Sequence, residues 1–227
     1  LERKKSSSNS PNAVPVQLRD YQKEAIHAWV DNHYHGFYVM ATGTGKTWTA
    51  IFSAKKLLET HSAMIVICAP YKHLVRQWAE DVVKTFPKAK LILVSSENPQ
   101  WEQQINQEII RKKYNPDNQI IIISTIASFK MGRFMATLHK SKEDKLLIVD
   151  EAHRFTDHPE ELKDEFKYML GLSATPYSGT SAQKGTELMN FFGGQVFNLP
   201  IEVALERGFL VPYNYYPIYV HATEDEE

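Results

Sequence analysis

The chain has 227 residues, a formal net charge of −1, 43% hydrophobic residues and 23% charged residues. These values are typical of one large α/β domain with short additions at its ends, and they exclude a disordered chain. No stretch reaches the roughly 18 apolar residues that a membrane span needs, and the start lacks the apolar segment of a secretory signal. We therefore expect an intracellular, cytoplasmic protein without a membrane partner. The single cysteine, Cys68, excludes a disulfide framework and a multi-cysteine metal site.

The chain ends differ in composition from the region between them. Residues 1–15 are rich in Ser, Asn, Pro, Lys and Arg without periodicity, which predicts a flexible linker or a remnant of cloning. We expect one folded domain over residues 16–220. Residues 221–227 contain an acidic run, and we expect them to be a tail.

Between these ends, short apolar segments alternate with segments of helical spacing. The apolar segments are β-branched and apolar on both faces, as strands of a parallel sheet are when helices cover both sides. We predict strands at 37–41, 63–69, 91–95, 120–124 and 146–150, and helices at 46–59, 74–85, 101–113 and 125–139. The alternation predicts an α/β three-layer sandwich with a mostly parallel central sheet, in which ligands bind beyond the carboxyl ends of the strands.

The strongest functional motif is ATGTGKT, residues 41–47, between the first predicted strand and the first predicted helix. Glycines here permit a backbone that turns amide hydrogens towards a phosphate, and the following helix N-terminus adds positive potential. Lys46 is then expected to reach the β and γ phosphates of ATP, and Thr47 to ligate Mg²⁺. The predicted phosphate-binding residues are Thr42, Gly43, Thr44, Gly45, Lys46 and Thr47.

This motif departs from the strict pattern G-x-x-x-x-G-K-[ST], because the first glycine would fall on Met40. The match therefore depends on the G-K-T core and its position between a strand and a helix. A turn rich in Gly and Thr before a helix is the structural alternative.

A second motif, LLIVDEAH, places Asp150 at the end of an apolar strand and Glu151 directly after it. A carboxylate in this position holds Mg²⁺ in phosphate-loop ATPases, so Asp150 is the expected metal ligand together with Thr47. Glu151 is placed to orient and deprotonate the attacking water. We predict Lys46, Asp150 and Glu151 as the catalytic residues. An exposed turn is the alternative for D-E-A-H.

Four further segments accompany these two motifs in order. They are QLRDYQKEAI (17–26), CAPYKHLVRQW (68–78), ISTIASF (123–129) and LSATP (172–176). The complete set resembles the first RecA-like motor domain of superfamily 2 DEAD/DEAH-type helicases, over nearly all of residues 17–220. The resemblance implies a RecA-like P-loop NTPase fold and an ATP hydrolase that drives a helicase or translocase.

The resemblance also implies roles for individual residues. Gln22 would read the adenine edge, with support from Arg19. The residues that would couple the ATP site to the nucleic-acid path are His153, Ser173 and Thr175. The residues that would line this path are Pro70, Tyr71, Lys72, Arg76, Ser124 and Thr125.

Purely structural interpretations stay open for several of these residues. Tyr21 and Gln22 can simply begin an amphipathic helix whose Ala25, Ile26 and Trp29 face the core. His153 can be a solvated residue, and Lys72 and Arg76 can belong to a solvated helix face. Ser124 and Thr125 can be the N-cap of the helix that follows them. Core packing can explain Cys68, Trp48 and Trp78.

The last part of the chain indicates a branch of the superfamily. Residues 191–220, FFGGQVFNLPIEVALERGFLVPYNYYPIYV, resemble the end of the first motor domain in restriction-enzyme motor subunits and related DNA repair translocases. There, a strand, a short helix and a turn lead to the second domain. Pro176 follows S-A-T where RNA helicases of the D-E-A-H type usually have Leu.

We therefore expect a motor that uses ATP and Mg²⁺ and acts on nucleic acid, with double-stranded DNA as the favoured substrate. Residues 16–220 would be its ATP-binding domain, and the tail over residues 221–227 would lead to a second motor domain. Its expected partners are this second RecA-like domain in the same full-length chain, which supplies the arginine finger, and a fused or associated nuclease. An RNA helicase is a competing interpretation. So is a degenerate P-loop domain that serves as a protein-interaction scaffold, although such a scaffold has no need for the complete set of ATP-site residues.

Overall fold

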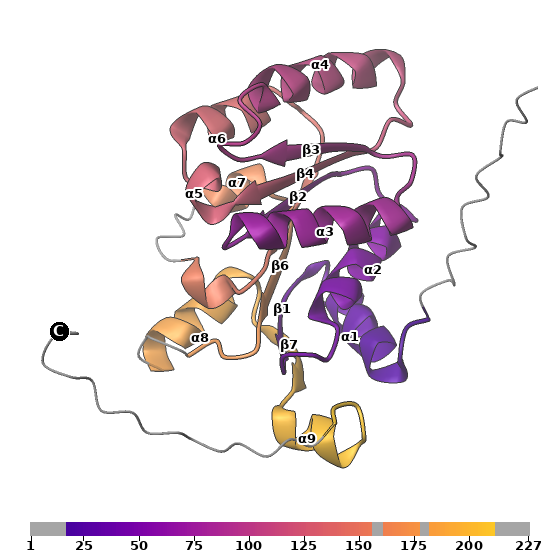
Figure 1. Ribbon diagram of the computed structural model, residues 1–227, viewed down its shortest axis with the longest axis vertical. Coiled ribbons are helices and arrows are strands. Elements are labelled where there is room, and N and C mark those ends of the chain that lie inside the picture. The colour runs from indigo at the N-terminus through magenta and orange to yellow at the C-terminus, as the bar shows by residue number, and fades with distance from the viewer. Residues whose placement is uncertain (1–16, 156–160, 178–181, 212–227) are drawn as a thin grey trace, which may run out of the picture.

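The computed structural model describes residues 17–155, 161–177 and 182–211. Within these residues, seven strands form one sheet in the order β3-β4-β2-β5-β6-β1-β7 (Figure 1), and each pair of neighbours is parallel. The strands are β1 His35–Met40, β2 Met64–Ala69, β3 Lys90–Val94, β4 Ile120–Thr125, β5 Lys145–Val149, β6 Tyr168–Ser173 and β7 Gln195–Leu199. All carboxyl ends of the strands therefore lie at one edge of the sheet.

Helices cover both faces of the sheet and complete three layers (Figure 1). On one face lie α1 Asp20–Asp31, α2 Lys46–Leu58, α3 Lys72–Thr85 and α9 Ile201–Glu206. On the other face lie α4 Trp101–Tyr114, α5 Ile126–Phe129, α6 Gly132–Leu138, the 3-10 helix η1 Ala152–Arg154, α7 Leu162–Glu165 and α8 Ala182–Phe191.

The core consists of two apolar clusters, one on each face of the sheet. Successive side chains of a strand point to opposite faces. In β2, Ile65 and Ile67 therefore pack with α1, α2 and α3, whereas Met64 and Val66 pack with α4, α5 and α6. All six residues of β2 are buried, as expected for a strand covered on both faces.

The predicted α/β sandwich with a mostly parallel sheet is confirmed, and the five predicted strands agree with the structure to within two residues at each end. Two details differ. The single helix predicted over residues 125–139 is wrong, because the extended backbone of Met131, with ψ of 125°, separates α5 from α6. The strand β6 was not predicted, because it overlaps the LSATP motif and contains Gly171, which lowers strand propensity.

Some predictions lie outside the described residues, among them the linker over residues 1–15 and the tail over residues 221–227. Within the described ranges, no helix combines the length and apolar character that crossing a membrane would take.

Candidate active site

The phosphate-loop motif forms a tight turn between β1 and α2. Gly43 and Gly45 have φ angles of 85° and 82°, a left-handed conformation that residues with a Cβ adopt only at a cost. A Cβ on Gly45 would lie 2.8 Å from Nε2 of Gln22, so the end of that side chain would have to move. The hydroxyl of the buried Thr44 donates to the carbonyl oxygen of Ala41 over 2.6 Å and closes the turn. This hydrogen bond and the two left-handed glycines set the conformation of the loop.

Lys46 begins α2 and carries a buried cation at the carboxyl edge of the sheet. Its residue is only 8% exposed, and its Nζ donates to the carbonyl oxygen of Met40 over 3.1 Å. Burial lowers the pKa of this ammonium group, while the nearby carboxylates of Glu151 and Asp150 partly offset that shift. The charge is thus held near two carboxylates without an ion pair to either, where a phosphate group would stabilise it.

The carboxylate of Asp150 is held by two donors at the end of β5. Its Oδ1 accepts a hydrogen bond from the backbone N–H of Glu151, and its Oδ2 accepts one from Nε1 of Trp78, each over 2.9 Å. The backbone N–H of Asp150 donates to the carbonyl oxygen of Cys68 over 2.8 Å, which continues the pairing between β5 and β2. Asp150 is 7% exposed, so its side chain has little freedom to reorient.

Glu151 occupies a strained position directly after the metal-ligand candidate. Its φ and ψ are 46° and 50°, a left-handed conformation that is uncommon for a residue other than glycine and costs roughly 1–3 kcal/mol. Its side chain is 29% exposed and can reach solvent, unlike that of Asp150. Consecutive carboxylates therefore have different surroundings, as a metal ligand and a general base require.

A polar chain links this segment to the end of β6. Nδ1 of His153 lies 3.4 Å from Oε2 of Glu151 and 3.0 Å from Oγ of Ser173. The same Oγ accepts a hydrogen bond from the backbone N–H of Thr175 over 3.1 Å. The three predicted coupling residues thus form one connected group beside Glu151, although a role in coupling stays a prediction.

The two predicted adenine-binding residues contact different segments, Gln22 the phosphate loop and Arg19 the turn at Phe209 that follows α9. Gln22 donates through Nε2 to the carbonyl oxygen of Gly45 over 3.3 Å and to Oγ1 of Thr49 over 3.2 Å. Arg19 donates through Nη1 to the carbonyl oxygen of Phe209 over 3.0 Å, and its guanidinium lies over the Phe209 ring. Both residues also begin α1, whose inner face is buried, so the helical interpretation is correct and adenine recognition stays a prediction.

Sequence reasoning missed the contribution of Tyr21 and of residues 209–210 to this site. The hydroxyl of Tyr21 donates to the carbonyl oxygen of Thr44 over 2.7 Å, and its ring packs against Phe209 with centroids 4.4 Å apart. Leu210 lies so close to Gly43 that a Cβ there would be 3.1 Å from its side chain. The YQ pair was a visible signal for α1, but no pattern indicated that a segment nearly 190 residues later closes over the loop.

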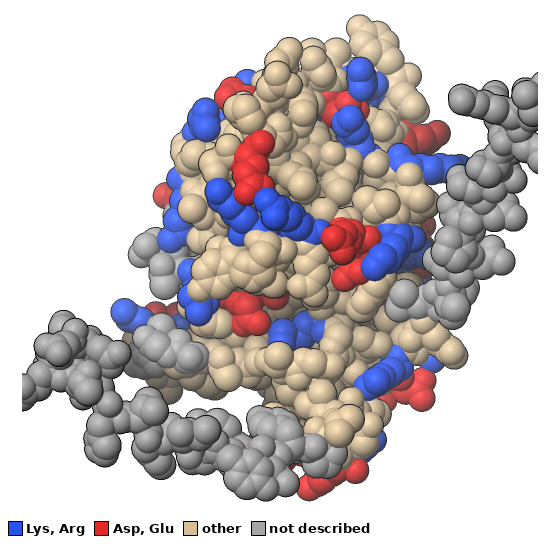
Figure 2. Space-filling model, in the orientation of Figure 1, with Lys and Arg blue, Asp and Glu red and all other residues tan. Residues whose placement is uncertain are grey.

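Among the predicted nucleic-acid contacts, those on α3 are exposed. Tyr71 is 46% exposed, and the guanidinium of Arg154 lies 5.2 Å from its ring centroid. Arg76 forms an ion pair with Glu97 over 2.8 Å, and Nζ of Lys72 lies 3.9 Å from the same carboxylate. On the face seen in Figure 2, basic and acidic side chains are interspersed. Basic side chains on this face are thus accompanied by acidic ones.

The contacts predicted on β4 and before α3 differ in accessibility. Ser124 is fully buried, and its hydroxyl donates to the carbonyl oxygen of Ile67 over 3.4 Å, so direct contact with nucleic acid would require the strand end to rearrange. Thr125 is the N-cap of α5, because its Oγ1 accepts from the backbone N–H of Ser128 over 3.1 Å. Pro70 is half-buried at the end of β2. The capping alternative for Thr125 is therefore correct, and nucleic-acid contact stays a prediction.

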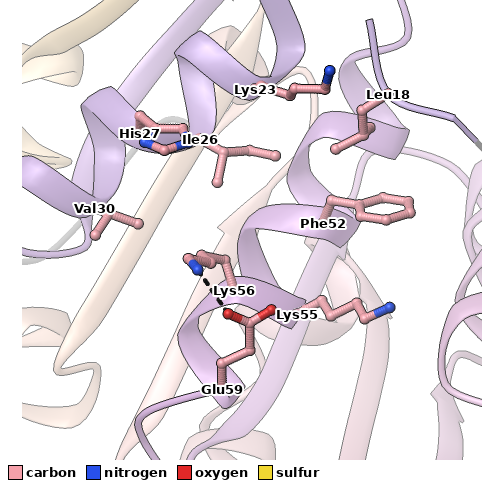
Figure 3. A pocket seen from close by; sticks show the side chains of 9 residues that line it. All are labelled: Leu18, Lys23, Ile26, His27, Val30, Phe52, Lys55, Lys56 and Glu59. Atoms are coloured by element: carbon pink, nitrogen blue, oxygen red, sulfur yellow. Dashed lines mark hydrogen bonds and ion pairs between the residues drawn. The ribbon is translucent and has the colours of Figure 1, made fainter. Parts of the chain in front are cut away.

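A separate apolar hollow of about 290 Å³ lies between α1 and α2, on the outer side of these helices (Figure 3). It is lined by Leu18, Lys23, Ile26, His27, Val30, Phe52, Lys55, Lys56 and Glu59. None of the predicted ATP-site residues belongs to this set, and Lys56 and Glu59 on its rim form an ion pair over 2.7 Å. The hollow is thus distinct from the phosphate loop.

The donors at the candidate site fit Mg²⁺. Asp150 offers a carboxylate and Thr47 a hydroxyl, and hard cations of this kind prefer oxygen ligands. Among the described residues, no group of three or more His, Cys, Asp or Glu side chains could hold a metal alone. Mg²⁺ characteristically keeps several waters and shares ligands with phosphates, so two protein oxygens beside a phosphate loop suit it.

Comparison with known proteins places this geometry in a family. A family model described as "Type III restriction enzyme, res subunit" matches residues 15–178. The chain belongs to this family. The DNA 3'-5' translocase XPB2 of Sulfurisphaera tokodaii is 24% identical over 215 residues, which cover 93% of this chain and 42% of that protein. A type I restriction enzyme EcoAI endonuclease subunit of Escherichia coli is 26% identical over 206 residues, 86% of this chain and 23% of the subunit.

Solved structures share the fold. A nuclease-deletion mutant of the type ISP restriction-modification enzyme LlaGI, in complex with a DNA substrate mimic, superposes with a TM-score of 0.70 at 19% identity. The match covers 85% of this chain and 21% of LlaGI. The predicted RecA-like fold and the resemblance to superfamily 2 motor domains are confirmed. The chain spans less than half the length of each of these relatives.

Proposed function

We propose that this domain binds and hydrolyses Mg-ATP as the first motor domain of a DNA translocase or helicase. The observation that carries the proposal is the position of Lys46. Its buried ammonium group follows a loop with two left-handed glycines and lies near enough to the carboxylates of Asp150 and Glu151 to feel their charge. A cation in this setting gains a strong partner when a phosphate group enters the loop.

The proposed chemistry assigns one task to each residue. Lys46 and the amides of residues 42–47 bind the phosphates and stabilise the charge that develops during in-line attack of water. Thr47 and Asp150 would hold Mg²⁺, which when bound neutralises phosphate charge. Glu151, with its partly exposed side chain and its neighbour His153, orients the attacking water and accepts its proton.

The proposed partners follow from the relatives and from the charges on α3. A DNA translocase and a restriction enzyme bound to a DNA mimic are among the similar proteins, which supports DNA as the substrate. Because the chain spans 42% of the translocase, we propose that a second RecA-like domain supplies an arginine finger, a group worth roughly 10³ to 10⁵ in rate. The restriction-enzyme relatives support a nuclease fused to or associated with the motor.

A Glu151→Gln substitution tests the enzymatic part of the proposal. The amide keeps the size of the side chain but cannot accept the proton, so we expect ATP binding to persist while turnover falls about 10²- to 10⁴-fold. The measurement combines titration with a fluorescent ATP analogue and phosphate release from a chain extended through the second domain. Glu102→Gln, on α4 beside the edge strand β3, is the control and should leave both unchanged. Unaltered turnover in Glu151→Gln would refute the assignment.

Two arginines of equal exposure test the proposed DNA path. Arg76 on α3 and Arg111 on α4 have side chains 64% and 65% exposed, and each pairs with one glutamate. Arg76→Gln should weaken DNA binding and reduce the slope of affinity against salt by about 1, because one phosphate contact is lost. Arg111→Gln should do neither. Glu97→Gln should strengthen binding, since it releases Arg76 and Lys72. Equal effects of the two arginine substitutions would place the path elsewhere.

A further inference from the structure

Among the described residues, Trp78 is the one whose side chain donates a hydrogen bond to the carboxylate of Asp150. The other donor is the backbone N–H of Glu151. Trp78 lies in the middle of α3 and is 1% exposed. Its N–H points at Oδ2, the oxygen that the Glu151 amide does not occupy. The rotation of the carboxylate is therefore fixed from both sides, by the turn that follows β5 and by a helix from the adjoining layer.

Packing alone does not account for a tryptophan here. Besides Trp78, the buried residues of α3 are Val75 and Val82, which need no polar partner, and Asp81, which forms an ion pair with Lys84 of the same helix. A buried indole N–H does need one, because leaving it unpaired costs free energy. Trp29 meets this need by donating to the backbone carbonyl of Met169 over 3.0 Å. Trp78 instead donates to the ionisable side chain that the site uses for its metal.

We propose that Trp78 is a positioning residue for the magnesium ligand Asp150. By donating to Oδ2, the indole holds the carboxylate in one orientation, and the lone pairs that remain are directed to the metal. Side chains that hydrogen-bond a metal ligand set both its orientation and its affinity for the metal. This inference rests on the proposed function, because it concerns the same ATP site.

The position of Trp78 also connects the metal ligand to the proposed DNA path. The same helix begins with Lys72 and carries Arg76 on its outer face. At its N-terminal end, Tyr71 contacts Arg154, which follows the acidic pair by only a few residues. The helix is thus attached to the segment 150–154 at two points, one buried and one exposed. A shift of α3 on DNA binding would move the donor that orients Asp150.

The test removes the N–H and keeps the shape of the ring. In the 227-residue chain, Trp78 is replaced by phenylalanine and, separately, by 3-benzothienylalanine, an isostere of tryptophan in which sulfur takes the place of N–H. Each protein is saturated with a fluorescent ADP analogue and titrated with Mn²⁺ as a probe for Mg²⁺. We expect the Mn²⁺ affinity of both variants to fall at least about 10-fold, the lower end for loss of a group that orients a metal ligand. The affinity for the ADP analogue in EDTA should stay within about twofold.

Trp29→Phe is the matched control, because it also removes a buried indole N–H that is hydrogen-bonded, at a place remote from the acidic pair. Its Mn²⁺ affinity should equal that of the unaltered chain. Unchanged Mn²⁺ affinity in the benzothienylalanine variant, or an equal loss in Trp29→Phe, would overturn the inference and leave the proposed function in place. If the unaltered chain bound no nucleotide with or without Mn²⁺, the proposed function itself would fail.

Discussion

One buried lysine lies at the amino edge of the sheet, where the strands begin, and another lies at the carboxyl edge, where they end. The surroundings of these two lysines differ. Lys145, at the start of β5, is 4% exposed. Its Nζ donates to the carbonyl oxygens of Ser141 and Glu143 over 2.9 and 3.1 Å and lies 2.9 Å from Oε1 of Glu165. Lys46, just beyond β1, is 8% exposed and donates to a single carbonyl oxygen among the described residues.

The difference distinguishes a lysine that stabilises the fold from a lysine that can bind an anion such as phosphate. A buried charge is tolerated when an opposite charge and hydrogen bonds replace its hydration. Lys145 has that replacement within the fold, from two carbonyl oxygens and the carboxylate of Glu165. Lys46 has only part of it, and burial accordingly lowers its pKa. An anion bound in the loop would therefore supply Lys46 with the close opposite charge that Lys145 already has.

Backbone strain alone does not make this distinction. Glu151, Gly43 and Gly45 are left-handed at the carboxyl edge, but His33 and Tyr34 are left-handed at the amino edge, in the turn between α1 and β1. The turn at residues 33–34 is explained by the need to reverse the chain in few residues. Strain marks a functional site only where a chemically competent side chain or an anion cradle accompanies it.

The largest expected effect comes from removing each lysine in turn. Lys46→Ala should abolish nucleotide binding and leave the free energy of unfolding unchanged or higher, because a partly compensated buried charge is removed. Lys145→Met should keep nucleotide affinity but lower the free energy of unfolding by up to about 3–5 kcal/mol, since the buried Glu165 loses its ammonium partner and keeps only the contact to His139. Denaturant unfolding and titration with a fluorescent nucleotide measure both quantities. If both variants lost both properties alike, the contrast between the two edges would be wrong.

A smaller effect is expected from the glycine that shapes the phosphate loop. Gly45→Ala should weaken nucleotide binding at least about 10-fold and destabilise the fold by about 1–2 kcal/mol, the cost of a left-handed residue with a Cβ. The new methyl group would also meet Gln22 at 2.8 Å. Gly132→Ala is the control, because a Cβ there has no atom within 4 Å and the position is helical. It should be neutral or stabilise by about 0.4–1 kcal/mol. Equal affinity in the two variants would contradict the assigned role of the loop.

Much of the fold could be predicted because its signals are local. Each strand of the parallel sheet is a short apolar run, and the glycines and Lys46 occupy adjacent positions in the sequence. The missed parts depend on spatial neighbours. Nothing around Trp78 in the sequence indicates that its N–H reaches Asp150, 72 residues later. The turn at Phe209 likewise meets Arg19 only because β7 lies beside β1.

The sequence also assigned several roles that the fold alone does not decide. Ser124 and Thr125 share a motif, but the fold buries the first in the sheet and uses the second to cap a helix. A hydroxyl in sequence has no direction, so capping, sheet packing and phosphate contact look the same until the strand end is placed. Gln22 likewise had both a helical and an adenine-reading interpretation, because its amide can serve either.

The smallest effect is expected from two tyrosine hydroxyls, one at each edge of the sheet. The hydroxyl of Tyr21 is buried and holds the carbonyl of Thr44 over 2.7 Å, whereas that of Tyr34 lies exposed, 3.3 Å from Oγ1 of Thr60. Tyr21→Phe should lower the free energy of unfolding by about 1 kcal/mol, the typical net value of a hydrogen bond inside a protein. Because the lost bond holds the phosphate loop, up to the same free energy can be lost from nucleotide binding, which corresponds to at most about a fivefold weaker affinity. Tyr34→Phe should change neither quantity measurably, since water replaces its partner. Denaturant unfolding and nucleotide titration on both variants decide the matter. A loss of affinity in Tyr34→Phe that matched Tyr21→Phe would mean that the amino edge takes part in binding, and that Tyr21 does not connect α1 to the loop in the way its hydrogen bond indicates.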